Sequence, residues 1–122
     1  MILVDPSVWV EHLRRGDADL AHRLDAGEVL GHPLVTGELA MGNLHRRDVL
    51  LGLLRALPQA VVASDDEVLT FVARYRLHGQ GVGYADAHLL ASAQLTPFAR
   101  LWTKDLRLAR IASEMGLAAT VR

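Results

Sequence analysis

The stretch ILVDPSVWVEHLRR (residues 2–15) indicates the architecture of this chain most directly. Its first three apolar residues (2–4) are typical of a buried parallel strand. In the segment 7–15, apolar residues recur with helical spacing, and charged residues occupy the other side. Asp5 stands between the two segments as a favoured helix N-cap, and Pro6 suits the first helical position. Taken alone, Asp5 is a cap.

Composition excludes several classes of protein. The chain has 122 residues, and 51% of them are hydrophobic, so we expect a single globular domain over residues 1–122. It has no cysteine, which excludes disulfides, thiolate metal sites and a cysteine nucleophile. A secretory apolar segment is missing, and no run reaches the ~18 apolar residues that cross a bilayer. We therefore expect a cytoplasmic protein with no membrane contact.

The charges give no global attraction to nucleic acid, because the formal net charge is −1. Most basic residues are nevertheless arginines, which suit phosphate. The main basic clusters are Arg14 with Arg15, Arg46 with Arg47, and Lys104 with Arg107 and Arg110. Those near Asp5 and Asp105 could contact RNA phosphates, although solvated helix faces are the simpler reading for any one of them.

Short apolar runs alternate with helical patterns along the whole chain. The expected strands are residues 2–4, 28–32, 59–63, 99–103 and 117–121. The expected helices are residues 7–15, 17–27, 33–44, 46–57, 64–77, 84–95 and 105–116. Such alternation implies parallel pairing through helical crossovers, and so an α/β fold: a three-layer α/β/α sandwich with a central parallel sheet.

Two acids follow predicted strands. In a parallel sheet the functional crevice lies beyond the carboxyl ends of the strands. Asp5 comes directly after the strand 2–4, and Asp105 comes shortly after the strand 99–103. We therefore expect both at one edge of the sheet. Asp105 also has a plain explanation, because an acid in a first helical turn interacts favourably with the helix dipole.

Two further acids fall on apolar helix stripes. Glu38 lies in line with Leu34 and Met41, and Asp86 repeats the pattern within residues 82–90. Each carboxylate is therefore expected to point where a helix normally places core residues. A hydrogen bond or an arginine partner could satisfy either acid alone.

Converging carboxylates need a counter-charge. Two like charges ~5 Å apart repel by roughly 3 kcal/mol at an effective dielectric of about 20. Without cations, such a cluster would destabilise the fold or take up protons. Mg²⁺ or Mn²⁺, which prefer oxygen ligands, would solve the problem directly.

The combined pattern resembles a known family. MILVDPSVWVEHL (1–13), the glutamate near residue 40, YADAHLLASAQL (84–95) and LWTKDLRLARIA (101–112) together look like the PIN domain of VapC-type toxins from toxin-antitoxin pairs. The resemblance covers the whole chain in order and length. It implies a PIN-like α/β/α sandwich with functional acids at the positions matched here by Asp5, Glu38, Asp86 and Asp105.

The resemblance also implies an activity and its partners. PIN toxins of this kind are endoribonucleases in which one or two Mg²⁺ or Mn²⁺ ions support attack of water on a phosphodiester. By this likeness Asp5 and Asp86 are direct ligands, Glu38 is a ligand or orients water, and Asp105 is a ligand, directly or through water. The implied partners are an RNA substrate (a transfer RNA or ribosomal RNA loop), a VapB-like antitoxin whose C-terminal segment lies across the groove, and a second copy in a homodimer.

Two hydroxyl residues and one departure accompany the acids. Ser7 and Thr103 match family positions where a hydroxyl is usual, and could orient the carboxylates. Ordinary hydrogen bonding at helix starts explains them nearly as well. Pro6 departs from the pattern, since many relatives have Thr or Ser directly after the first Asp. Asp5 is expected to cap its helix through its backbone position and to offer its carboxylate to metal.

Other features have plain explanations. The six histidines, at positions 12, 22, 32, 45, 78 and 88, show no ligand spacing and are expected to be surface or satisfied residues. GQGVG (79–83) is read as a flexible loop, not a dinucleotide fingerprint. Trp9 and Trp102 are assigned to the core, although they could stack on bases. Apolar residues in the segment 46–57 suit a partner groove, a dimer contact or burial in the same domain.

Two other functions remain open. A phosphoacceptor receiver domain has similar length, but it needs an acid at the end of its third strand, and RALPQAVVA (55–63) has none. A non-catalytic PIN-like scaffold that binds RNA or protein is the second alternative. The presence of all four acids argues against it.

Overall fold

A three-stranded parallel sheet forms the centre of the protein. The computed structural model describes residues 1–120. The strands are β1 (Ile2–Val4), β2 (Val29–Leu30) and β3 (Arg100–Trp102). Their order is β2-β1-β3, and Leu3 lies opposite Leu30 on one side and Leu101 on the other. All three leucines are buried. The carboxyl ends of β1 and β3 therefore meet at one edge of the sheet.

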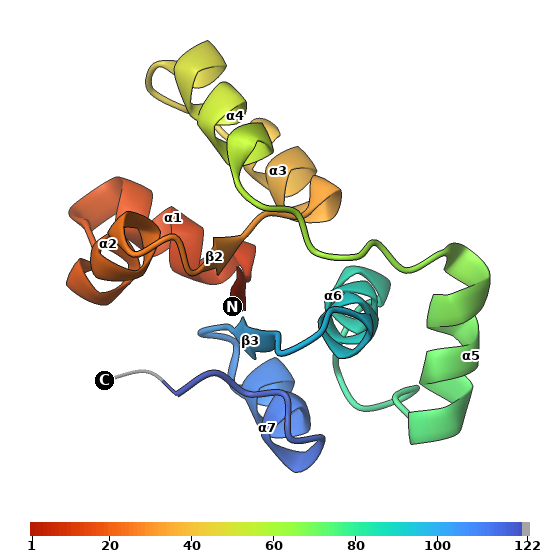
Figure 1. Cartoon of the computed structure of the whole chain (residues 1–122). Helices are drawn as coiled ribbons and strands as arrows, with labels where there is room; N and C mark the ends of the chain where they lie inside the picture. The colour runs from red at the N-terminus through yellow and green to blue at the C-terminus, as the bar shows by residue number, and fades with distance from the viewer. Residues whose placement is uncertain (121–122) are drawn as a thin grey trace.

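Helices cover the sheet on two sides. They are α1 (Pro6–Arg15), α2 (Ala18–Asp25), α3 (Pro33–Ala40), α4 (Arg47–Ala56), α5 (Asp65–Tyr75), α6 (Tyr84–Leu95) and α7 (Leu106–Glu114). Figure 1 shows α1 and α2 on one side of the strands and α6, backed by α5, on the other. The paired helices α3 and α4 project from the end nearest β2 (Figure 1). The predicted α/β sandwich with a central parallel sheet is confirmed.

The two predicted outer strands are reduced to single bridges. Gly31 pairs with Gln59, and Leu101 pairs with Ala118, but neither contact extends into a strand. After Gln59 the backbone N–H groups have other partners, which explains why no strand forms there. The N–H groups of residues 61 and 63 donate to Thr96 Oγ1 and Ser92 Oγ instead of to a neighbouring strand. Residue 121 of the last predicted strand lies outside the described residues.

Side chains at the helix starts explain where the helices begin. Asp5, Asp17 and Asp105 cap α1, α2 and α7 with carboxylate oxygens, and Ser64 begins α5 as part of a capping box. The predicted helix 33–44 is too long. The helix α3 ends at Ala40, after which turn-type hydrogen bonds lead into a glycine-containing loop.

The core lies between the sheet and its helices. Trp9 and Trp102 are both buried, which confirms their assignment to the core. The helix α4 buries Leu54 but exposes Val49 and Leu53. The apolar segment 46–57 therefore contributes to the core on one face and leaves apolar surface on the other. No helix within residues 1–120 is long and apolar enough to cross a membrane.

Candidate active site

Asp5 lies at the carboxyl end of β1, as predicted. It is only 6% exposed. Its Oδ2 accepts hydrogen bonds from the Ser7 amide (2.9 Å) and from the Thr103 hydroxyl (3.2 Å). Its Oδ1 accepts none from residues 1–120. The Asp5 carbonyl accepts from the Val8 amide (3.1 Å), so the backbone begins α1 as expected. The carboxylate also caps the helix through Oδ2, which was not expected, and Oδ1 stays free for another ligand.

Two hydroxyl groups connect the loops that follow β1 and β3. The Ser7 hydroxyl accepts from the Lys104 amide (3.0 Å) and lies 3.4 Å from Thr103 Oγ1. Thr103 Oγ1 accepts from the Asp105 amide (3.1 Å) while it donates to Asp5. Both predicted hydroxyls therefore lie beside the first acid. Their effect on ion binding stays a prediction.

Asp86 lies in the first turn of α6 and is half-buried. Its Oδ2 accepts from the Gly83 amide (3.0 Å). Burial raises the pKa of the Asp86 carboxyl, the Gly83 bond opposes this shift, and the charges of Asp5, Asp105 and Glu38 raise the pKa further. Asp86 is thus near enough to the other three predicted acids to feel their charges.

Asp105 caps α7 and is exposed. Its Oδ1 accepts from the amides of Arg107 (2.9 Å) and Leu108 (3.0 Å). The ordinary role at a helix start therefore exists, and the second oxygen does not take part in it. Asp105 does not line the same pocket as the other three acids.

Glu38 is exposed, and the prediction that it points where α3 places core residues is wrong. The buried face of α3 is formed by Val35 and Leu39. Met41, on the stripe predicted to face inward, is 87% exposed. The helix ends soon after Glu38, and the Glu38 side chain borders a surface pocket.

Three of the four acids share one pocket. It has a volume of about 220 Å³ and is lined by Asp5, Glu38 and Asp86. The apolar lining includes Leu34 and Val35 of α3 and Leu89 of α6. The helices α3 and α6 thus form two walls of the cavity, and each brings a carboxylate to the cavity that Asp5 lines. We refer to this cavity as the acidic pocket.

The donor set suits a hard divalent cation, but the side chains are not closed around one. Carboxylate oxygens are the ligands that Mg²⁺ and Mn²⁺ prefer. Among the described residues, however, no three His, Asp or Glu side chains are grouped closely enough to hold one metal ion. Amide N–H groups occupy one oxygen each of Asp5, Asp86 and Asp105, so the second oxygen of each carboxylate is the one available to a cation.

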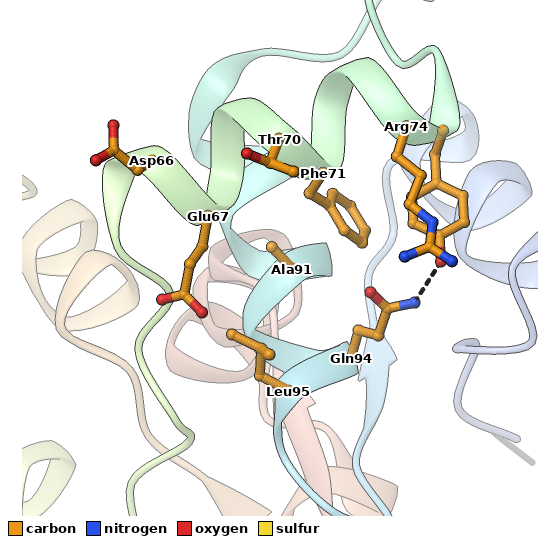
Figure 2. A pocket seen from close by; sticks show the side chains of 9 residues that line it. Asp66, Glu67, Thr70, Phe71, Arg74, Ala91, Gln94 and Leu95 are labelled. Atoms are coloured by element: carbon orange, nitrogen blue, oxygen red, sulfur yellow. Dashed lines mark hydrogen bonds between the residues drawn. The ribbon is translucent and has the colours of Figure 1, made fainter.

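Two other cavities border the same helices. A groove of about 510 Å³ between α1, α3 and α4 shares Pro6 and Glu38 with the acidic pocket, and Val10, Leu13 and Leu50 line it. A cavity of about 330 Å³ lies between α5 and α6 (Figure 2). There Gln94 Nε2 donates to the Tyr75 hydroxyl (2.9 Å). This second cavity contains none of the predicted site residues.

Sequence comparison places these features in a family. The PIN domain profile matches residues 2–114. This chain belongs to the PIN-domain family. It is 52% identical over 118 residues to Ribonuclease VapC32 of Mycobacterium tuberculosis, in both the CDC 1551 / Oshkosh and the ATCC 25618 / H37Rv strains, and the match covers 97% of this chain and 95% of each relative. It is thus a PIN domain of the VapC type.

Two solved structures have a similar fold. The crystal structure of FitAcB from Neisseria gonorrhoeae has a TM-score of 0.62 at 24% identity and covers 93% of this chain and 94% of that chain. A structure of FitAB bound to an IR36 DNA fragment has a TM-score of 0.60 at 20% identity, with coverage of 93% and 91%. The PIN fold excludes the receiver-domain alternative.

The basic residues near the acids of this PIN domain are spread over its surface. Lys104 pairs with Asp17 at 3.7 Å. Arg107 lies over Gly81, where an added Cβ would be 2.7 Å from its Nη1. Gly81 has a φ of +81°, so GQGVG is a loop, as predicted, and it is held against α7. Arg14 lines the apolar groove.

The sequence did not indicate that two histidines of this PIN domain are buried. Histidines were expected at the surface or with satisfied hydrogen bonds, and His32 is indeed satisfied, but it is completely buried and caps α3. For His88 the expectation is wrong, because it is buried and its Nδ1 has no hydrogen-bond partner among the described residues. A histidine between a strand and a Pro-initiated helix was the only available signal, and it is a weak one.

Proposed function

We propose that this protein is a divalent-metal-dependent endoribonuclease toxin, inhibited by a cognate antitoxin. The observation that supports this most directly is the acidic pocket, where Asp5, Glu38 and Asp86 face one cavity at the carboxyl edge of a parallel sheet. The family and the 52% identity to a named ribonuclease favour the same activity.

The four acids have different roles in this proposal. Asp5 and Asp86 are direct ligands of Mg²⁺ or Mn²⁺, since both are partly or fully withdrawn from solvent and Oδ1 of Asp5 is free. Glu38, exposed on α3, is a ligand or orients the attacking water. Asp105, outside the pocket, takes part directly or through water. When bound, the cation lowers the pKa of water and offsets charge on the attacked phosphate.

Thr103 and Ser7 orient the first acid. By occupying Oδ2 of Asp5, the Thr103 hydroxyl and the Ser7 amide direct the remaining oxygen away from the helix start. Hydrogen bonds that hold a metal-binding carboxylate in one orientation strengthen ion binding. RNA is held by phosphate contacts from nearby arginines, and its bases are presented from a single-stranded loop of a transfer or ribosomal RNA.

The groove between α1, α3 and α4 is the proposed antitoxin site. It is apolar, it adjoins the acidic pocket through Pro6 and Glu38, and an extended or helical segment lying in it would reach the carboxylates. Replacing Leu13 with Asp should abolish the complex with the product of the neighbouring small open reading frame and leave RNA cleavage intact. Leu69→Asp, a like change on exposed α5 surface, is the control. An intact Leu13→Asp complex would reject this location. The homodimer stays a prediction, checked by sedimentation.

The catalytic proposal is tested by cleavage of structured RNAs with Mg²⁺ or Mn²⁺. The wild type should cleave only with the ion, and Asp5→Asn and Asp86→Asn should lose at least about 100-fold in rate. Asp66→Asn, which alters an exposed acid on α5, is the matched control and should behave as wild type. Cleavage that persists in both Asp5→Asn and Asp86→Asn would contradict the proposal. Absence of ion-dependent cleavage with intact RNA binding would favour the scaffold alternative.

A further inference from the structure

A buried histidine joins the two helices that form the walls of the acidic pocket. His32 has no exposed surface. Its Nδ1 accepts from the Leu34 amide (3.0 Å), and its Nε2 lies 2.9 Å from the hydroxyl of Ser92 on α6. The Ser92 hydroxyl also accepts from the Ala63 amide (3.2 Å). Three chain segments therefore meet at one serine oxygen.

The hydrogen bonds define the protonation of His32. Since Nδ1 accepts an amide N–H, it carries no proton, and the neutral ring must carry its proton on Nε2 and donate it to Ser92. The environment keeps the ring neutral, because burial and the neighbouring His88 lower the pKa of His32 to about 4. The His88 ring packs edge-on against it, with centroids 5.3 Å apart.

The His32 to Ser92 bond is placed to control the pocket. Among residues 1–120 it is the only hydrogen bond between the start of α3 and the helix α6. His32 begins α3, which presents Glu38, and Ser92 lies on the same helix as Asp86. Both carboxylates are about 9 Å along their helices from the bond, at 1.5 Å per residue. A rigid helix passes a shift at the bond on to its carboxylate.

We propose that His32 and Ser92 are positioning residues for the acidic pocket: their hydrogen bond sets the separation of α3 and α6, and so the separation of Glu38 from Asp86. This inference rests on the proposed function, because it concerns ion binding at the same acids. Neither residue lines the pocket, and neither contacts the ion or the RNA.

Three variants separate positioning from simple support of the fold. Ser92→Ala deletes the bond, together with the bond from the Ala63 amide to the same oxygen, and leaves the His32 cap of α3 intact. His32→Asn keeps a side-chain cap for α3, but is too short to reach Ser92. Ser64→Ala removes a capping bond of α5 and is the matched control, since it loses one hydrogen bond on an element that does not line the acidic pocket.

The primary readout is the Mn²⁺ affinity of the folded protein, measured by calorimetry, with RNA cleavage measured in parallel. We expect Ser92→Ala and His32→Asn each to weaken Mn²⁺ binding about three- to tenfold, the effect of one hydrogen bond. The double variant should be no weaker than the weaker single variant, because both changes remove the same bond. Ser64→Ala should lower thermal stability with unchanged Mn²⁺ affinity.

The outcomes distinguish this inference from the proposed function. If the wild type neither binds Mn²⁺ nor cleaves RNA with it, the proposed function fails. If the wild type does both, but Ser92→Ala and His32→Asn match Ser64→Ala in Mn²⁺ affinity, the bond only supports the fold and the positioning inference is overturned. Strictly additive losses in the double variant would also overturn it.

Discussion

The Thr103 hydroxyl donates a 3.2 Å hydrogen bond to Oδ2 of Asp5, although the two residues are 98 positions apart in the sequence. The bond joins the loops that leave β1 and β3. The Ser7 amide shares the same oxygen, and Oδ1 keeps no donor from the described part of the chain. One oxygen of Asp5 thus serves the fold, and the other is available to a ligand.

Thr103→Val should weaken ion binding with little change in shape. Valine fills the same space but cannot donate to Asp5 or accept from the Asp105 amide. We expect Mn²⁺ affinity to fall about tenfold, as for other groups that orient a ligand. Calorimetric titration measures this, and Thr70→Val on exposed α5 is the control. Equal affinities for wild type and Thr103→Val would show that the hydroxyl only supports the loops.

Asp86→Asn should make the ion-free protein at least as stable as the wild type at neutral pH. The pKa of the Asp86 carboxyl is raised in the folded state, so its protonated form favours folding. That stabilisation is fully present below the ordinary pKa of 3.8 and is lost as pH rises through the raised value. Asparagine carries no charge and escapes the loss, while its amide oxygen can still accept from Gly83.

Thermal unfolding in chelator and in Mn²⁺ measures this prediction. Mn²⁺ should raise the midpoint of the wild type and have little effect on Asp86→Asn, because an ion that binds only the folded state stabilises it. Asp66→Asn should respond to Mn²⁺ as the wild type does. A clearly lower midpoint for Asp86→Asn in chelator would contradict the prediction that the ionised Asp86 carboxylate destabilises the ion-free fold.

Two glycine substitutions should distinguish the stability cost of strain in the loop from an effect of Arg107 on RNA binding. Gly79 and Gly81 both have positive φ, +71° and +81°, so alanine at either position should cost about 1 kcal/mol of stability. Only at Gly81 would the new Cβ displace Arg107. We expect Gly81→Ala alone to weaken RNA binding, measured by fluorescence anisotropy in an Asp86→Asn background. Equal RNA affinities for the two variants would remove Arg107 from the RNA surface.

The stability of the fold should fall in acid because His32 is buried in the neutral form. Its pKa is lowered from 6.5 to about 4, so the unfolded chain binds a proton more readily than the folded one. Stability should therefore decrease as pH falls from about 6.5 to about 4, by about 3 kcal/mol at 1.36 kcal/mol for each pKa unit.

Urea unfolding of the wild type and of His32→Asn over this pH range measures the effect. The variant has no imidazole to protonate at this position, so its stability should depend less on pH. An NMR titration that finds His32 titrating near its ordinary value, or equal pH slopes for both proteins, would contradict this prediction.

Sequence patterns were sufficient for the central strand and for most helices. The run of residues 2–4 is buried as β1, and the acids after β1 and β3 lie at one edge, because parallel strands end together. The two outer strands, 59–63 and 117–121, were predicted to be strands, but only single bridges form there within the described residues. Composition does not reveal that Thr96 and Ser92 would take the backbone N–H groups of residues 61 and 63.

The sequence predicted which acids lie near one another, but not how their side chains are oriented. Periodicity placed Glu38 on an apolar stripe, yet the core face of this short helix is formed by Val35 and Leu39. The His32 to Ser92 bond joins residues 60 apart, and no local pattern indicates such a pairing. Tertiary contacts of this kind depend on how the helices pack against one another.

Anomalous diffraction from crystals soaked in Mn²⁺ tests the central claim most directly. We predict an Mn²⁺ peak in the acidic pocket, about 2.0–2.2 Å from carboxylate oxygens of both Asp5 and Asp86, with Glu38 turned toward it. The peak should vanish in Asp86→Asn crystals. A map with no peak at these acids at saturating Mn²⁺, or one whose only peak lies at a different group of residues, would contradict the account.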